Sequence, residues 1–420
     1  WSLAALPFNY WGMALALLLL IVPAVLLARY QAAPGNRAPD SPPLRGWLLA
    51  ITVLLLSLIA LRYATLAQEL LLRPLFLWDA WMNWSPKPTV WFHHQELVPF
   101  VSKEAWLARG DDTMVYTAGA SNAWRYPPGI PLILLWNMLG FGVSDHTVLY
   151  LPWLLAPLAL GLVLFGHLAL SGAPLPVAVL ACYALLNLPF MNAHVALPGY
   201  ADVWVAAVFG CAVFALQEWD SHRRWPYGLL ALVFALMCTQ LKIPGVIMGG
   251  IVMVLFLLAL ARVGVKAILA ALVLLALLAG YAFTVGIDFS LPAVGGRVVL
   301  SAEVIQLPFI GIYEIAFHPV QEAMLTAIFL MLNWNLLWFL FLGTLLARLI
   351  SGRRFTRPSV TLQAIVVAAL FIGFVYFMTN RYQFALDFTQ VNRALVYLVP
   401  PLVYYVFRSW LEMTAGRNRR

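Results

Sequence analysis

The residues best suited to chemistry lie together in one stretch, LWDAWMNWSPKPTVWFHH, at positions 77–94. Within it, the carboxylate of Asp79 stands between Trp78 and Trp81. A carboxylate held among aromatic rings is suited to accept a proton from a hydroxyl group, which makes Asp79 a candidate general base. An interfacial belt of aromatic residues would explain the tryptophans alone, but it would not explain the carboxylate.

Several cations are candidates for the same site. Lys87 belongs to the aromatic stretch, and further cations occur at four later positions, Arg125, Lys242, Arg381 and Arg393. Long basic side chains often only extend to the membrane interface, and each of these residues taken alone fits that description. Together they could bind an anionic headgroup, such as a lipid phosphate or diphosphate, through charge-assisted hydrogen bonds.

A divalent metal is a second interpretation of the aromatic stretch. His93, His94 and Glu96 are the residue types of such a site, and His194 and His318 are more distant candidate ligands. The helical spacing of an HExxH motif is absent from the sequence, and adjacent histidines usually point in different directions. A GxxxxGK[ST] loop is also absent, so the sequence does not support a mechanism driven by a nucleoside triphosphate.

The rest of the chain is mostly apolar. Of its 420 residues, 63% are hydrophobic and 10% are charged, whereas soluble domains carry about 25% charged residues. The sequence therefore predicts a polytopic membrane protein. The net charge of +8 comes from basic residues in short loops, which indicates membrane orientation rather than nucleic-acid binding. The three cysteines, at 182, 211 and 238, lie in apolar segments and are expected to be buried thiols.

Apolar runs of about 20 residues predict an all-α fold of about eleven transmembrane helices. They lie near 11–29, 46–64, 147–169, 174–191, 201–217, 227–243, 245–262, 266–284, 323–349, 360–379 and 393–410. One further run, at 130–141, is shorter and follows the helix-breaking sequence YPPG.

Basic loops fix the expected topology, because positive charge collects on the cytoplasmic side. All five basic clusters fall on that side only if the 130–141 run does not cross the membrane. They are Arg29 with Arg37 and Arg45, Arg223 with Arg224, Arg262 with Lys266, Arg348 with Arg353, Arg354 and Arg357, and Arg417 with Arg419 and Arg420.

This topology predicts three parts of the chain. Residues 1–45 would form an extra transmembrane helix with a cytoplasmic loop, 46–410 the main transmembrane domain, and 411–420 a basic cytoplasmic tail. Within the main domain, two long outer loops are expected, at 64–145 with interfacial helices and at 286–321. Loops of this length are usually functional.

Five motifs occur in one order along residues 46–410: WDAWMNWSPK, RYPPGIPLILLW, LPGYADVWVAA, LKIPG and VNRALVYLVPP. Their order and topology resemble the polytopic glycosyltransferases of the GT-C class, in the bacterial branch related to protein O-mannosyltransferases and lipid A aminoarabinose transferases. Many members carry two adjacent acidic residues where this chain has Asp79 followed by Ala80. Members also often have an acidic residue beside the lysine that corresponds to Lys242.

The resemblance implies a GT-C architecture and transfer of a sugar from a polyprenyl-phosphate donor to a lipid, glycan or protein acceptor. The reaction would take place on the outer face of a bacterial inner membrane, by inverting displacement. Asp79 would be the catalytic base, and the donor phosphate would bind Lys87, Arg125, Lys242 and Arg393. Substrate would contact Trp78, Trp81, Trp84, Trp91, Tyr126, Tyr200 and Asp202, although Asp202 equally fits an ordinary charge at a helix N-terminus.

Two other functions stay open. A transporter or flippase of a lipid-linked glycan would need polar residues near the membrane midplane, where the expected spans carry almost no charge. A non-catalytic subunit of a cell-envelope complex would instead use the outer loops to bind a partner protein.

Overall fold

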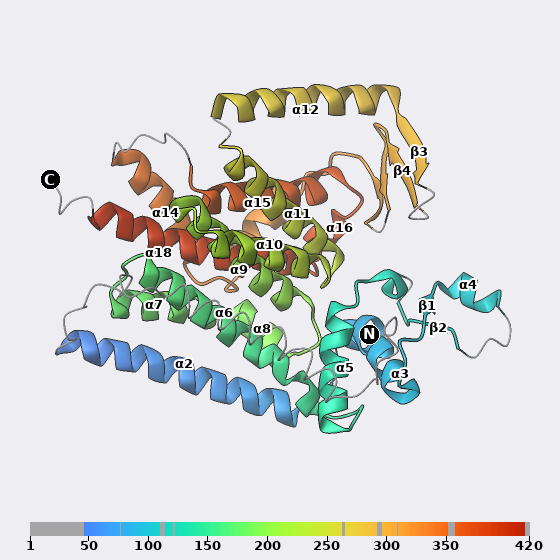
Figure 1. Cartoon of the computed structure of the whole chain (residues 1–420), viewed down its shortest axis with the longest axis horizontal. Helices are drawn as coiled ribbons and strands as arrows, with labels where there is room; N and C mark the ends of the chain where they lie inside the picture. Colours follow the sequence, from blue (N-terminus) through green and yellow to red (C-terminus); the bar gives the residue numbers. More distant parts are fainter. Residues whose placement is uncertain are drawn as a thin grey trace. The chain divides into compact units, whose positions relative to one another are not determined.

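The computed structural model describes residues 46–75, 77–109, 114–120, 122–262, 265–291, 296–308, 310–351 and 358–415 (Figure 1). The expected first helix at 11–29, the basic residues at 353, 354 and 357, and the last five residues of the tail lie outside these ranges. The chain forms two compact units, Trp1–Asn187 with Asn192–Val203 and Leu188–Met191 with Trp204–Arg420. Each unit is described by itself.

Three long helices build the body of the first unit: α2 (Trp47–Leu72), α6 (Leu151–Leu170) and α7 (Leu175–Leu186) pack against one another. Helix α2 continues beyond the expected end at residue 64, so the first outer loop begins later than predicted. Helix α8 (Pro189–Ala196) follows α7 after a 60° bend. The bend divides the span expected at 174–191, because the residue before a proline disfavours helical backbone.

The segment predicted to be the first outer loop contains short elements that connect α2 to α6. They are the π-helix η2 (Ala80–Trp84), α3 (Pro86–His94), β1 (Phe100–Val101), α4 (Lys103–Leu107), β2 (Tyr116–Thr117), the 3₁₀-helices η3 (Ala123–Arg125) and η4 (Thr147–Tyr150), and α5 (Gly129–Phe141). Strands β1 and β2 pair in parallel. Helix α3 packs on α5 around a small core of Trp91, Val98 and Leu135.

The loop leaves and returns at the same end of the α2–α6 pair. The hydroxyl of Thr147, at the start of η4, donates a hydrogen bond of 2.7 Å to the carbonyl oxygen of Leu71, near the end of α2. Helix α5 has 13 residues and is about 20 Å long, which is too short to cross the roughly 30 Å hydrocarbon core of a bilayer. The expectation that 130–141 does not cross agrees with this geometry.

The second unit contains most of the remaining helices. They are α9 (Asp202–His222), which continues from the first unit, α10 (Trp225–Thr239), α11 (Ile243–Leu260), α12 (Val265–Val285), α13 (Gln321–Leu325), η6 (Thr326–Leu330), α14 (Leu337–Ile350), α15 (Val360–Met378), α16 (Gln383–Leu386), α17 (Val391–Leu395), η7 (Val396–Leu398) and α18 (Val399–Ala415). Helix α9 is largely buried; Phe214 contacts Tyr404 of α18, and Trp219 stacks on Phe256 of α11.

A four-stranded antiparallel sheet occupies much of the second long outer loop. Its strands are β3 (Ile287–Leu291), β4 (Gly296–Leu300), β5 (Val304–Leu307) and β6 (Gly311–Glu314), paired in this order. The expectation of an all-α fold is therefore wrong for this loop, although the described chain is mostly helical. The β-branched pairs Val298–Val299 and Val304–Ile305 in VVLSAEVIQL are the signal that favours strands here.

Among the described residues, six helices are long and apolar enough to cross a membrane, or seven if α7 and α8 form one bent span. They are compatible with a multi-pass membrane protein, but the eleven expected spans are not reproduced. The span expected at 323–349 is divided into α13 with η6 and, after a break, α14. Asn335 adopts a left-handed conformation in this break, with φ of 48°, which asparagine tolerates better than most residues.

Candidate functional site

Asp79 lies at the start of a π-helical turn in the first unit. It directly precedes η2 and is half-buried, while the rings of Trp78 and Trp81 are 61% and 60% exposed. The Trp81 indole N–H donates to the carbonyl oxygen of Leu75 over 2.8 Å, which holds this ring in place. Two exposed aromatic rings thus flank a carboxylate, on a helix type that is frequent at functional sites.

The LPGY motif packs directly against the residue that follows Asp79. Gly199 has a φ of +107°, and a Cβ atom built on it would lie 2.4 Å from the Cβ of Ala80, which is fully buried. Only glycine combines this backbone conformation with such a close approach. The contact also leaves no room beside Gly199 for a side chain larger than alanine at position 80.

Lys87 is predicted to bind phosphate, and the structure gives its ammonium group two partners within the protein. It donates to the carbonyl oxygens of Trp124 and Tyr126, over 2.9 and 3.0 Å. The side chain is buried, and burial lowers the pKa of Lys87 to about 8. Lys87 therefore links α3 to η3 and to the first residue of the YPPG motif. Its role in phosphate binding stays a prediction.

Three buried polar atoms of the contacting elements η2 and η3 have no hydrogen-bond partner among the residues that the structure describes. They are the amide oxygen of Asn83, the indole nitrogen of Trp84 and the Nε of Arg125. Trp84 also stacks on Tyr126, with ring centroids 5.2 Å apart. A buried polar atom without a partner costs about 1–3 kcal/mol, so this cluster lowers the stability of the chain unless further hydrogen bonds form there.

Tyr200 and Asp202 follow Gly199 and also belong to the first unit. The carbonyl oxygen of Tyr200 accepts a hydrogen bond of 2.7 Å from the Trp153 indole. The ring centroids of Tyr200 and His194 lie 5.1 Å apart. Asp202 is the first residue of α9 and is fully buried. This placement favours a structural role at the helix start over direct contact with substrate.

The histidines of the aromatic stretch are exposed and engage other side chains. Nε2 of His94 lies 2.6 Å from the hydroxyl of Tyr116, and Nε2 of His93 lies 3.3 Å from the hydroxyl of Ser144. Within the described residues, no group of three or more His, Cys, Asp or Glu side chains could hold a metal ion. The metal interpretation of His93, His94 and Glu96 therefore receives no support from the geometry.

Trp91, which was expected to border sugar or lipid, is instead part of the core of the outer loop. Its ring is buried, and its indole N–H donates to the carbonyl oxygen of Val98 over 2.9 Å. Packing disfavours that expectation for Trp91, because the helical spacing of α3 places it on the face that packs against α5.

The predicted cations of the second unit are half-buried. Lys242 precedes α11, and Arg393 lies on α17. Their approach to each other and their part in phosphate binding stay predictions. Arg381 stacks over Tyr313, with its guanidinium carbon 5.5 Å from the ring centroid.

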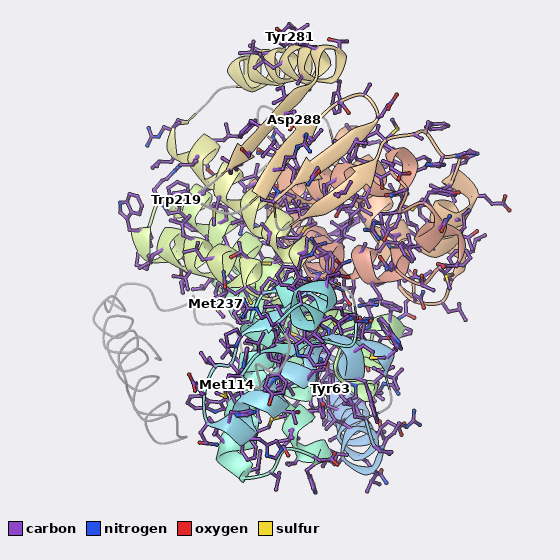
Figure 2. All side chains as sticks on the ribbon, turned by 90° about the vertical axis from the view of Figure 1, so that its right-hand side faces the viewer. Tyr63, Met114, Trp219, Met237, Tyr281 and Asp288 are labelled. Carbon is purple, nitrogen blue, oxygen red and sulfur yellow. The ribbon has the colours of Figure 1, made fainter. Side chains whose placement is uncertain are left out.

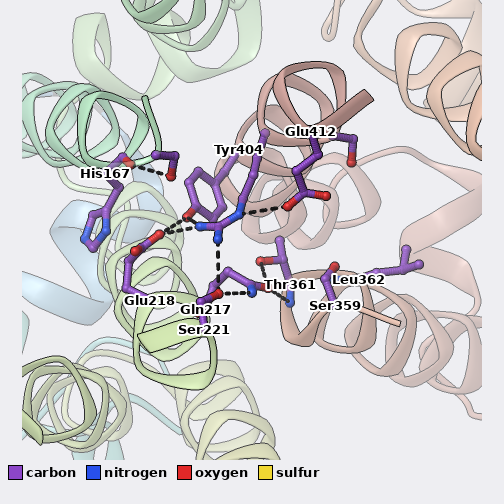
Figure 3. A network of polar contacts seen from close by, with 12 residues as sticks. His167, Gln217, Glu218, Ser221, Ser359, Thr361, Leu362, Tyr404 and Glu412 are labelled. Atoms are coloured by element: carbon purple, nitrogen blue, oxygen red, sulfur yellow. Dashed lines mark hydrogen bonds and ion pairs between the residues drawn. The ribbon is translucent and has the colours of Figure 1, made fainter. Parts of the chain in front are cut away.

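The second unit also holds a buried ionic network that sequence reasoning missed (Figure 3). The carboxylate of Glu218 on α9 forms an ion pair with Arg408 of α18 and accepts a hydrogen bond of 2.9 Å from Tyr404. Arg408 also donates to Ser221, over 3.1 Å. The amide oxygen of Gln217 accepts from the backbone and the hydroxyl of Thr361 on α15. The network joins three helices that are far apart in sequence.

Comparisons with protein-family models, with curated proteins and with solved structures find no match for this chain. The GT-C resemblance thus stays a prediction that rests on the motifs.

Proposed function

We propose that the protein is a membrane glycosyltransferase that moves a sugar from a polyprenyl-phosphate donor to an acceptor hydroxyl. The observation that carries the proposal is the cluster of Asn83, Trp84 and Arg125 in the same outer loop as Asp79. Its two unpartnered donors fit phosphate or sugar oxygens, and its unpartnered acceptor fits a sugar hydroxyl. The exposed rings of Trp78 and Trp81 are suited to stack on a sugar or border a lipid tail.

In this mechanism, Asp79 accepts the proton of the acceptor hydroxyl while the oxygen of that hydroxyl attacks the anomeric carbon of the donor sugar. A new glycosidic C–O bond forms, and the bond from the anomeric carbon to the phosphate oxygen breaks with inversion. The leaving polyprenyl phosphate takes the bonding electron pair. Hydrogen bonds from Arg125 and Trp84 would stabilise the negative charge that develops on it. We place the reaction on the extracytoplasmic face of a bacterial plasma membrane.

The ionic network gives little support to the transporter and flippase alternatives, which need polar residues near the membrane midplane. Glu218 lies only about one turn from the end of α9 at His222, not near the middle of the helix. Midplane charges are what transport sites typically use. The non-catalytic alternative predicts that loss of the Asp79 carboxylate changes no measurable reaction.

The test of the proposed function is the Asp79→Asn variant, assayed in proteoliposomes with a panel of polyprenyl-monophosphate hexoses and an extract of envelope lipids and glycans as acceptor. We expect transfer to fall by about 10²- to 10⁴-fold with donor binding retained, because the amide keeps the shape but cannot accept the proton. Glu104→Gln, an exposed carboxylate of the same loop, serves as the control and should retain activity. Equal activity of the wild type and Asp79→Asn would refute the assignment of the base. Donor movement between leaflets without transfer would support a flippase.

A further inference from the structure

The sheet of the second outer loop is amphipathic. Strand register places Ile287, Phe289, Leu291, Val298, Leu300, Ile305 and Leu307 on one face, which is called the apolar face below. This face carries no charged residue. The charged residues of the four strands, Asp288, Arg297 and Glu314, lie on the opposite face, where Arg297 Nε donates to Asp288 over 2.7 Å.

The apolar face stays partly open in the described structure. Phe289 and Leu291 are 47% and 36% exposed, and the other five side chains are half-buried. An apolar patch that remains open on a folded chain normally marks an interaction surface. On β6, Tyr313 belongs to the same face and lies under Arg381, so the open part is formed by β3, β4 and β5.

The position of the sheet along the chain indicates what covers this face. Strand β3 begins directly after α12, with Gly286 as the one residue between them. Helix α12 is not one of the six helices counted above, but it has 21 residues and is about 32 Å long, which matches the roughly 30 Å hydrocarbon core of a bilayer. Most of its described exposed side chains are apolar, and they include Val273, Leu274, Leu277 and Leu278. The end of such a helix lies where hydrocarbon meets headgroups.

Aromatic residues mark the same boundary. Figure 2 shows Tyr281 on the last turns of α12 and Asp288 on the adjoining strand. Tyr281, Phe289 and Phe317 are 63%, 47% and 66% exposed, and aromatic rings gather at membrane interfaces. Within the described strands, β3 pairs only with β4, so its outer edge is open. Open edges do not occur within hydrocarbon, which limits the sheet to the interfacial layer.

We propose that the β3–β6 sheet is a membrane-surface module that rests its apolar face on the lipids of the leaflet in which α12 ends. The polar face, with the Asp288–Arg297 ion pair, is directed to water. The proposal needs a membrane-embedded chain but does not depend on the sugar-transfer reaction.

Spin labels on single cysteines test the proposal in the full chain, with Cys182, Cys211 and Cys238 replaced by alanine. Labels at Phe289→Cys and Leu291→Cys report on the apolar face, and a label at Ser290→Cys reports on the opposite face of the same strand. Ile312→Cys is the matched control, because Ile312 is apolar and 55% exposed but lies on the polar face. The protein is reconstituted in vesicles of phosphatidylethanolamine and phosphatidylglycerol. Collisions are measured with oxygen, which concentrates in lipid, and with a nickel chelate, which stays in water.

We expect labels at 289 and 291 to collide mainly with oxygen, and labels at 290 and 312 to collide mainly with the nickel chelate. Similar collision ratios at 289 and 290 would place the whole sheet in water and overturn the proposal. Low collision rates with both reagents at 289 and 291 would show that protein covers the face, which would also overturn it. All four positions are partly or fully exposed, and agreement between 289 and 291 guards against a defect of one variant.

Discussion

Lys87 shows how a single residue type can be identified from sequence while its partners cannot. Its place in an aromatic stretch made it a candidate phosphate ligand, and the structure shows that its side chain is buried. Its partners, however, are backbone carbonyls of residues 124 and 126, which carry no sequence signature. Asp79, Trp78 and Trp81 could be selected as candidates because an interfacial aromatic belt explains the tryptophans but not a carboxylate between them. The unpartnered atoms of Asn83, Trp84 and Arg125 depend on packing and could not be predicted.

Burial of Lys87 predicts a specific pH dependence of stability. The pKa falls from 10.5 to about 8 in the folded chain, so between these values the unfolded chain binds more protons than the folded chain. Stability from this residue should therefore rise with pH from about 8 to 10.5. Thermal unfolding in detergent at several pH values should show this rise in the wild type and in Lys103→Met, which alters an exposed lysine of the same loop. Lys87→Met should lack it, and an identical rise in Lys87→Met would contradict the assignment.

At the scale of elements, the contact between Gly199 and Ala80 ties the LPGY segment to η2. Gly199→Ala should destabilise the protein by about 1–3 kcal/mol, because the new methyl group clashes with Ala80. Gly142→Ala is the matched control: it also has a positive φ, of +69°, but no atom lies within 4 Å of the added Cβ. Thermal unfolding should show the larger loss for Gly199→Ala. The double variant with Ala80→Gly should recover part of it, and no recovery would refute the clash.

The ionic network between α9 and α18 gives a second prediction for elements. Glu218→Gln removes the buried carboxylate partner of Arg408 and leaves the more exposed Glu412, 3.3 Å from Arg408 Nε, so the cost should be up to about 3–5 kcal/mol. Glu218→Gln combined with Arg408→Met should cost less than the sum of the two single changes. Additive losses, measured by unfolding in detergent, would show that the two side chains are not coupled.

At the scale of the whole molecule, most helices could be predicted because apolar runs of membrane length are a strong signal. The breaks within the runs at 174–191 and 323–349 were not predicted, although Pro189 marks the first. At the second, the indole of Trp334 donates to the carbonyl oxygen of Ala327 in η6. The sheet was missed because a search for 20-residue runs gives little weight to strands of four or five residues.

The first outer loop starts and ends at the same end of the α2–α6 pair, which predicts on which side of the membrane the two ends of α6 lie. Gln95 is an exposed residue of that loop, and Ser171 follows the 24-residue helix that spans Thr147–Leu170. That helix is about 36 Å long, so cysteines introduced at 95 and 171 should react with an impermeant maleimide from opposite sides. Intact spheroplasts and inverted vesicles provide the two sides. Reaction of both positions from one side would contradict the predicted topology, including the predicted outer location of Asp79.

The π-helical turn of η2 has a consequence for how the sequence can vary in length. A π-helix accommodates one residue more than an α-helix, as the hydrogen bond from Ser85 to Ala80 shows. Loss of one residue between Ala80 and Trp84 would restore an ordinary α-helix without breaking the chain path. It would also turn Asp79 by about 100° relative to Trp84 and Lys87. A homologue that is one residue shorter here could therefore fold while its Asp79 no longer faces the same residues. The number of residues from Asp79 to Trp84 is thus a better marker of shared function than the identity of any residue between them.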